Sequence, residues 1–360
     1  MTDFEDQPSA VRDGEEIDVT RLEAWLRGRI AHTSGGVTVA QFARGYSNLT
    51  YLIRAGEREL VLRRSPPGVK IKSAHDMGRE FRVLSHLANV WSKSPRPVAY
   101  EEDESVIGTP FYLMERVYGI VLRARAPHGL ILDEAAMRRV SEAVVDTLAE
   151  IHLVDWRAAG LADLGKPEGY VERQLAGWTA RYRKAQTDDV REIELVREWL
   201  FAEQPPEDAA ALIHNDFKYD NLVFDAGLTR VVAVLDWEMA TVGHPWMDLG
   251  TTLGYWVEAR DPPVFQTMAF GPTALLGNLS RAELVRRYEA RTKRPVERLL
   301  FTYVFALYKM AIVAQQLYRR YVDGATRDGR YATMLEGARA VSASALVAIE
   351  KARIDRLGEP

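Results

Sequence analysis

The sequence predicts an α+β protein of two lobes, in which a small antiparallel β-sheet with one helix precedes a larger, mainly helical part. Three observations support this prediction. The chain has 360 residues, more than a single hydrophobic core usually holds. Hydrophobic residues alternate with a period of two between residues 37 and 64, as they do in half-buried strands. After residue 119 they recur mainly at helical spacing, so the two lobes differ in class.

Composition and charge exclude several classes of protein. With 47% hydrophobic residues, 27% charged residues and a net charge of −4, the chain has the profile of a soluble enzyme without a nucleic-acid-binding surface. It contains no cysteine, which excludes disulfides, thiolate metal sites and a cysteine nucleophile. No apolar run reaches the ~18 residues that span a bilayer, and the acidic N-terminus resembles no targeting signal. We therefore expect a cytoplasmic protein that binds no nucleic acid and no membrane, and its oligomeric state stays open.

The first lobe is predicted to extend over residues 20–115. Residues 1–19 are acidic and lack apolar periodicity, so a flexible segment is expected there. Thr20 is predicted to cap a short helix that ends at Ile30. Three antiparallel strands follow over residues 37–64, separated by turns rich in Gly, Ser and Asn.

The rest of this lobe is one helix and two further strands. Ser73, with an acid three residues later, resembles a helix N-cap, and the helix is expected to end near Ala88. Strands at residues 98–100 and 109–114 complete a five-stranded sheet. Residues 115–119 would then leave the sheet as a linker.

The second lobe, residues 116–360, is predicted to be mainly helical. Apolar residues recur at helical spacing over residues 140–151 and 175–182, and again from residue 281 to the end. One β-hairpin interrupts this pattern, because two short apolar strands flank a Gly-containing turn within residues 221–235.

Asp216 and Lys218 lie on a loop that directly follows the apolar strand at residues 211–213. Metal-assisted phosphoryl transfer needs a base, a cation and two metal ligands. The sequence offers such a set, since Asp216 is followed by Lys two positions later, by Asn five positions later and by a second Asp twenty positions later. We expect Asp216 to orient and deprotonate an acceptor hydroxyl, and Lys218 to neutralise charge on the transferred group. Alone, Asp216 could be a turn residue and Lys218 a solvated lysine, but their combination favours catalysis.

Asn221 and Asp236 complete this pattern as candidate metal ligands. The hairpin between them is expected to bring the end of its return strand, Asp236, back beside Asn221. Amide and carboxylate oxygens are ligands that Mg²⁺ prefers, with water and phosphates in the remaining positions. Asn221 could also be an ordinary turn residue, whereas an acid at the end of an apolar strand is hard to explain as core.

Three further polar residues are expected to support the site. His214 is interpreted as a brace of the loop through hydrogen bonds rather than as a proton carrier. Asp248 is expected to hold the backbone of the loop. Glu238 could be a second metal ligand or a hydrogen-bond partner of the loop, and the sequence leaves both open.

The first lobe offers candidate nucleotide-binding residues. The turn at residues 44–50 has backbone N–H groups and small hydroxyls that could cradle phosphates, although ordinary hairpin turns have the same composition. Alternation places Val61 and Arg63 on one face of a strand, where Val61 could pack on adenine and Glu80 could hold Arg63. A solvated Arg and a solvated Glu are the alternatives. The candidates are Gly45, Ser47, Asn48, Thr50, Val61, Arg63, Glu80 and, through the linker backbone, Glu115 and Val117.

Besides the catalytic loop, seven segments carry a resemblance to a known family: residues 45–51, 62–64, 73–75, 79–80, 111–116, 235–238 and 305–309. The chain resembles the aminoglycoside phosphotransferase and choline kinase superfamily, which has a two-lobed protein-kinase-like fold. Its closest likeness is to the branch found as the kinase domain of some acyl-CoA dehydrogenases. The resemblance implies ATP as donor, Mg²⁺ as cofactor and a small-molecule hydroxyl as acceptor.

The same resemblance implies that Asp216 is the base and that Asn221 and Asp236 bind the metal. Two positions depart from the family pattern. Asn215 stands where Gly is usual, and Asn tolerates unusual backbone angles better than most residues. His244 stands where an acid is common, in a turn that flanks the site.

The charge of the C-terminal helices bears on the acceptor. Residues 281–330 contain twelve basic and five acidic residues, which suits an anionic acceptor better than a polycationic aminoglycoside. A solvated helix face unrelated to the site is the other explanation. We expect an anionic hydroxylated metabolite, with a hydroxyacyl-CoA as first candidate and an aminoglycoside as alternative.

Two rival interpretations are weaker. A nucleotide-binding pseudokinase scaffold would not need the complete set of base, cation and metal ligands. A protein kinase needs a long activation segment after the metal-binding Asp, and Asp248 stands only twelve positions after Asp236.

Overall fold

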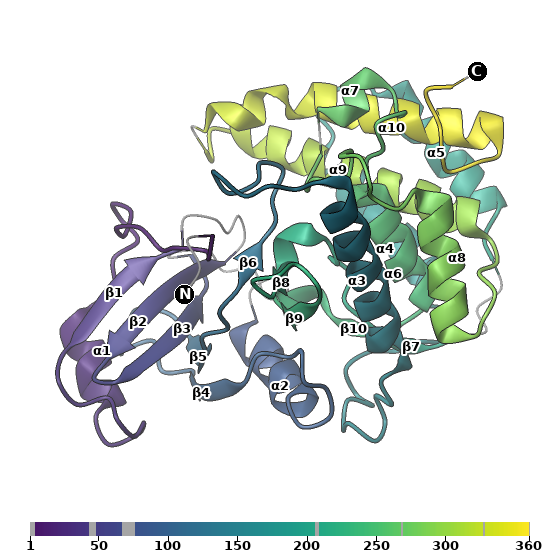
Figure 1. The fold of residues 1–360 in the computed structure, drawn as a ribbon. Helices are drawn as coiled ribbons and strands as arrows, with labels where there is room; N and C mark the ends of the chain where they lie inside the picture. The colour runs from purple at the N-terminus through teal and green to yellow at the C-terminus, as the bar shows by residue number, and fades with distance from the viewer. Residues whose placement is uncertain are drawn as a thin grey trace. The chain divides into compact units, whose positions relative to one another are not determined.

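The protein forms two compact units in the computed structural model (Figure 1). The structure describes residues 4–42, 48–66, 76–205, 209–267, 269–326 and 328–359. Unit 1 consists of Met1–Val121, Ala158–Leu161 and Asn221–Ala240, and unit 2 of Leu122–Arg157, Ala162–Asp220 and Thr241–Pro360. The α+β class and the division into a sheet-bearing part and a helical part are confirmed.

Unit 1 is built on a five-stranded antiparallel sheet with the strand order β1-β2-β3-β5-β4. Leu60 and Leu62 of β3 point into a core that also contains Trp25, whereas Val61 and Arg63 lie outside that core. The alternation expected from the sequence is therefore correct. The elements are α1 (Val19–Leu26), β1 (Val37–Gln41), β2 (Leu49–Ala55), β3 (Arg58–Arg64), α2 (Met77–Leu87), β4 (Pro97–Glu101) and β5 (Phe111–Glu115).

The N-terminal segment differs from the expected flexible segment. Ser9 pairs with Gln41 of β1, the carbonyl oxygen of Glu15 accepts a hydrogen bond of 2.7 Å from the Tyr51 hydroxyl, and Ile17 is buried in the sheet core. Residues 4–18 are therefore packed on unit 1. The acidic composition misled the prediction, because backbone groups, the Glu15 carboxylate and the apolar residues Val11 and Ile17 all contact the sheet or its core.

Both helix starts in this unit were predicted at the wrong residue. Asp18 caps α1, since its carboxylate accepts from the Arg21 N–H, and the helix ends at Leu26 rather than at residue 30. Asp76 caps α2 in the same way, through the Arg79 N–H. The expected cap Ser73 lies outside the described residues. An Asp at the N-cap competes directly with Ser or Thr, so nearby candidates are hard to separate by sequence.

The hairpin β8 (Leu222–Phe224) and β9 (Val231–Val234) belongs to unit 1, whereas the sequence placed it in the second lobe. The reason is a third strand, β6 (Ile120–Val121), which extends the first unit beyond the expected boundary at residue 115 and pairs with β8. Buried apolar residues of the three strands pack together in this small sheet. The segment after β9 is tied to α2, because the Trp237 N–H donates to Glu80 over 3.0 Å. The candidate metal ligands therefore share a unit with the strands that carry the candidate nucleotide-binding residues.

Unit 2 is mainly helical, as predicted. Its longest helix, α9, lies beside α10 and forms much of the core (Figure 1). The strands β7 (Ala211–Ile213) and β10 (Thr241–Gly243) pair with each other. The helices are α3 (Glu134–Leu153), α4 (Tyr170–Ala185), α5 (Arg191–Ala202), α6 (Pro245–Tyr255), α7 (Pro263–Gln266), α8 (Arg281–Thr292), α9 (Leu299–Val322) and α10 (Met334–Lys351), with short 3₁₀ turns at Tyr219–Asn221, Trp237–Met239 and Gly329–Thr333.

Two helical segments, Leu299–Val322 and Gly329–Lys351, are long and apolar enough to cross a membrane by length and composition. In the first, 78% of the most apolar window is buried within the protein, as expected of a core helix. In the second this share is 44%. The sequence analysis looked for an uninterrupted apolar run and did not detect these two segments, because polar residues interrupt both of them.

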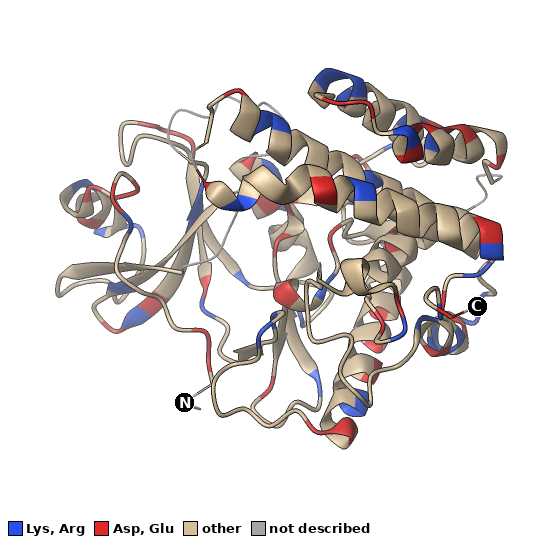
Figure 2. Cartoon of the chain, turned by 90° about the horizontal axis from the view of Figure 1, so that it is seen from above, with Lys and Arg blue, Asp and Glu red and all other residues tan. Residues whose placement is uncertain are grey.

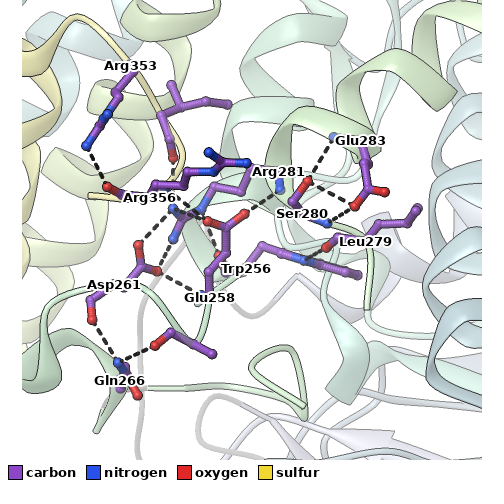
Figure 3. Close-up of polar contacts among 12 residues, drawn as sticks. Trp256, Glu258, Asp261, Gln266, Leu279, Ser280, Arg281, Glu283, Arg353 and Arg356 are labelled. Carbon is purple, nitrogen blue, oxygen red and sulfur yellow. Dashed lines mark hydrogen bonds and ion pairs between the residues drawn. The ribbon is translucent and has the colours of Figure 1, made fainter. Parts of the chain in front are cut away.

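A buried arginine joins distant parts of unit 2 (Figure 3). The Arg281 side chain is fully buried and forms a two-pronged ion pair with Asp261, which is also buried. Its Nε donates to the Trp256 carbonyl oxygen and its Nη1 to the Ile354 carbonyl oxygen, each over 2.8 Å. This cluster ties the segment after α6 to the C-terminal segment.

Arg281→Ala is expected to destabilise the protein by about 3 to 5 kcal/mol, because it leaves the Asp261 carboxylate buried without its partner. Urea unfolding measured by circular dichroism checks this. Arg319→Ala is the control, since Arg319 forms an exposed pair with Asp323 that is worth at most about 1 kcal/mol. Equal losses in the two variants would contradict the structural importance of the buried pair.

Candidate active site

Asp216 lies on the loop that follows β7, and both oxygens of its carboxylate accept hydrogen bonds. The Lys218 ammonium group donates to Oδ2 over 2.7 Å, and the Tyr255 hydroxyl donates to Oδ1 over 2.7 Å. Burial would raise the pKa of Asp216, but Lys218, followed by Lys309 and the Tyr255 hydroxyl, lowers it below its ordinary value. Asp216 is therefore ionised at neutral pH and able to accept a proton.

Asp248 holds the backbone of this loop from α6. Its Oδ2 accepts from the His214 N–H and its Oδ1 from the Asn215 N–H, both over 2.7 Å. His152 of α3 lies 3.1 Å from the same carboxylate through Nε2. Burial would raise the pKa of Asp248, but these groups lower it, so a fixed negative charge stands behind the loop. This geometry agrees with the support expected of Asp248.

His214 is fully buried, and its Nδ1 accepts from the Asp216 N–H over 3.3 Å. The His214 ring thus holds the backbone of Asp216 in place. Asn215 has φ of +65°, the left-handed region, which accounts for Gly being usual at this position. The Tyr170 hydroxyl donates to its side-chain oxygen over 3.0 Å, which offsets the strain of that conformation.

Lys309 was not predicted as a site residue. It lies in the middle of α9, is buried, and its ammonium group donates to the Asn215 carbonyl oxygen over 2.7 Å. Burial lowers the pKa of Lys309, while the Asp216 and Asp248 carboxylates oppose this. The sequence carried a usable signal, because Lys309 is the one charged residue in α9 before Arg319.

In unit 1, Arg63 of β3 lies among three acidic side chains. Its guanidinium is 2.8 Å from Asp236, 3.4 Å from Glu80 and 3.9 Å from Glu238. Arg63 and Glu80 are both buried. Burial would lower the pKa of Arg63, but Glu80 and Asp236 raise it well above its ordinary value. Arg63 and Glu80 form the expected ion pair, and Arg63 forms a second ion pair with Asp236.

The hairpin places the two candidate metal ligands at the same end of unit 1. The Leu235 N–H donates to the Asn221 carbonyl oxygen over 2.8 Å, so the return strand ends opposite Asn221, one residue before Asp236. Asp236 has φ of +68°, an uncommon conformation for a residue other than Gly.

One amide and one carboxylate suit a hard cation that takes its other ligands from water and phosphate. Among the described residues no group of three or more His, Asp or Glu side chains could hold a metal ion by itself. The Asn221 amide and the Asp236 carboxylate are donors that fit Mg²⁺.

The structure describes most of the other candidate nucleotide-binding residues. Asn48 donates to the Glu238 carboxylate, and the Arg79 guanidinium donates to the Glu238 carbonyl oxygen over 2.8 Å, so Glu238 has structural partners in unit 1. Thr50 pairs with Arg63 across β2 and β3, and Val61 lies opposite Met114 of β5. Glu115 ends β5 and Val117 packs on the sheet of β6, β8 and β9. Gly45 and Ser47 lie outside the described residues.

The basic excess in residues 281–330 is partly compensated by acids elsewhere in unit 2. Arg287 pairs with Asp146 of α3 over 2.8 Å, Arg298 lies 3.7 Å from Glu203, and Arg281 is paired with Asp261. In Figure 2 acidic and basic positions are scattered over the same helices. The charge count within one segment therefore overstates the positive charge that is available to an acceptor, and the acceptor stays a prediction.

Comparison with known proteins gives consistent matches over most of the chain. The model of the phosphotransferase enzyme family matches residues 38–285. Acyl-CoA dehydrogenase family member 10 of Mus musculus is 35% identical over 317 residues, which are 87% of this chain and 29% of that protein. Family member 11 of Homo sapiens is 35% identical over 86% of this chain and 40% of that protein. The chain thus spans less than half the length of these relatives.

Solved structures match over nearly their whole length. A protein of Ralstonia eutropha, named as an aminoglycoside phosphotransferase, is 33% identical with a TM-score of 0.76, covering 91% of this chain and 96% of that one. A thermostable mutant of the aminoglycoside phosphotransferase APH(4)-Ia, solved with AMP-PNP and hygromycin B, shares the fold at 19% identity. Its TM-score is 0.58 over 90% of this chain and 97% of that one.

Proposed function

The chain belongs to the phosphotransferase enzyme family, and we propose that it transfers the γ-phosphoryl group of ATP to a hydroxyl group of an anionic small molecule. The observation that carries this proposal is the ionised Asp216 with the Lys218 ammonium group 2.7 Å away, on a loop whose backbone Asp248 holds. A carboxylate fixed in this way accepts a proton from an alcohol at little cost in reorganisation.

The residues have separate roles in the proposed reaction. Asp216 orients the acceptor hydroxyl and takes its proton as the oxygen–phosphorus bond forms and the bond to ADP breaks. Lys218 stabilises the charge on the phosphoryl oxygens. Asn221 and Asp236 would hold Mg²⁺, which neutralises phosphate charge when it is bound. Arg63 orients Asp236 by a hydrogen bond of 2.8 Å.

Two observations favour an anionic acceptor, with a hydroxyacyl-CoA as first candidate. Lys309 adds a second ammonium group near Asp216, and among the described residues no carboxylate lies within ion-pairing distance of it. A buried cation without a carboxylate partner suits an anionic or strongly polar acyl oxygen of a substrate. The relatives named acyl-CoA dehydrogenases also connect this domain with acyl-CoA chemistry.

An aminoglycoside is the second candidate, favoured by the name of the Ralstonia eutropha protein. A polycationic acceptor would meet two ammonium groups beside the base, which is unfavourable. The experiment is ATP–Mg²⁺ turnover on matched panels of hydroxyacyl-CoAs, free hydroxy acids and kanamycin-type amines. We expect the anionic panels to be phosphorylated at least tenfold faster. Faster turnover of the amines would overturn the anionic acceptor, and nucleotide binding without any transfer would favour a scaffold.

A further inference from the structure

We infer that Tyr255 is a positioning residue for the catalytic carboxylate, and that it keeps Asp216 ionised and correctly turned toward the acceptor. This inference rests on the proposed function, because it concerns the same base. The Tyr255 hydroxyl donates to Asp216 Oδ1 over 2.7 Å, on the opposite oxygen from Lys218. The two donors together fix the rotation of the carboxyl group about its bond to Cβ.

Tyr255 itself is held from several directions. It is the last residue of α6, and the next residue, Trp256, is anchored twice. The Trp256 carbonyl oxygen accepts from Arg281, and its indole N–H donates to the Leu279 carbonyl oxygen, each over 2.8 Å (Figure 3). The Tyr255 ring packs edge-on against Phe270, with the ring centroids 4.9 Å apart. The hydroxyl therefore has little freedom to leave Asp216.

The same ring also fixes the cation of the site. The Lys218 ammonium group lies 5.0 Å from the centroid of the Tyr255 ring and 5.9 Å from that of Phe270, within the range of a cation–π contact. Lys218, Tyr255 and Phe270 line one small pocket of unit 2. One aromatic residue thus contacts both the base and its neutralising partner beside this small pocket.

The chemistry of the contact determines its effect. A hydroxyl group forms a stronger hydrogen bond to an ionised carboxylate than to a protonated carboxyl group. The contact with Tyr255 therefore favours the charged form of Asp216. A carboxylate offers about four lone-pair sites, so an acceptor hydroxyl can bind Asp216 while the tyrosine stays in place. Among the described residues, the charged groups that act on Asp216 include Lys218 on its own loop and Lys309 on α9, and Asp248 on α6 lies behind the loop.

Tyr255→Phe removes this donor and keeps the ring. The carboxylate then becomes easier to protonate, so the acid limb of the kcat/KM profile moves to higher pH. On that limb we expect kcat/KM to fall about tenfold, with a smaller loss on the plateau, as for loss of one charge-assisted hydrogen bond. Tyr303→Phe is the matched control, because the Tyr303 hydroxyl has no hydrogen-bond partner among the described residues.

Direct titration of the Asp216 carboxyl by ¹³C NMR, in wild type and in Tyr255→Phe, gives a readout that does not require turnover. An upward change of its pKa in the variant alone, with an unchanged far-UV spectrum, supports the inference. An unchanged titration overturns it, even if the enzyme is active. If the wild-type protein transfers phosphate to none of the acceptors, the proposed function is contradicted. The titration then still decides whether Tyr255 acts on Asp216.

Discussion

Asp216→Asn is expected to lower phosphoryl transfer by roughly 10²- to 10⁴-fold while nucleotide binding stays within about twofold of wild type. Asn has the same shape but neither a negative charge nor a basic oxygen, so it cannot take the proton of the acceptor. The Lys218 ammonium group also loses its ion pair, which leaves a positive charge that phosphate oxygens can still satisfy. The measurement is ATP turnover with the best acceptor, together with AMP-PNP binding by calorimetry.

Asp323→Asn is the matched control for this experiment. Asp323 follows α9 and forms an exposed pair with Arg319, so the same chemical change there should leave turnover unaltered. Retained transfer in Asp216→Asn would remove Asp216 from its role. Loss of both transfer and nucleotide binding would instead indicate a folding defect, which thermal unfolding of the variant identifies.

Arg63→Met is expected to lower kcat/KM for ATP–Mg²⁺ by at least tenfold and to destabilise the protein by about 3 to 5 kcal/mol. Without the guanidinium, Glu80 and Asp236 face each other with no cation between them in unit 1. Burial already raises the pKa of Glu80, although Arg63 opposes this, so the variant should protonate Glu80 still more readily. Asp236 would then lose the contact that orients it for a metal ion.

Arg63→Lys separates charge from geometry. An ammonium group keeps the charge but lacks the planar fork that reaches two carboxylates at once, so an intermediate loss is expected. Arg54→Met is the control, since Arg54 lies on the neighbouring strand in a half-exposed pair with Glu59. Nucleotide kinetics and urea unfolding are measured for all three variants. Unchanged nucleotide kinetics in Arg63→Met would contradict the assigned role.

Local chemistry made much of the site predictable. Alternation along β3 put Val61 and Arg63 on the face away from the core, and the structure has them there. The hairpin spacing predicted that the return strand would end opposite Asn221, and the Leu235 hydrogen bond agrees. These features depend on neighbours within one or two elements, so periodicity and turn chemistry contain them.

Other parts of the site could not be read in this way. Tyr255 ends an apolar helix and looks like a core residue until its hydroxyl is placed 2.7 Å from Asp216. Lys309 stands 93 positions after Asp216, and no local pattern connects the two. The basic excess after residue 281 suggested an anion-binding face, but Asp146 and Asp261 compensate part of it from other elements.

The sequence by itself determined the reaction class. Asp216, Lys218, Asn221 and Asp236 lie within one loop and one hairpin, where short-range geometry fixes their spacing. The tertiary structure decided how the charges of these residues are set. It joined Arg63, Glu80 and Asp236 within unit 1, and it brought Tyr255 and Lys309 to the loop of Asp216 in unit 2. Electrostatic contacts act through space, so the groups that tune a carboxylate come from wherever the core packing brings them.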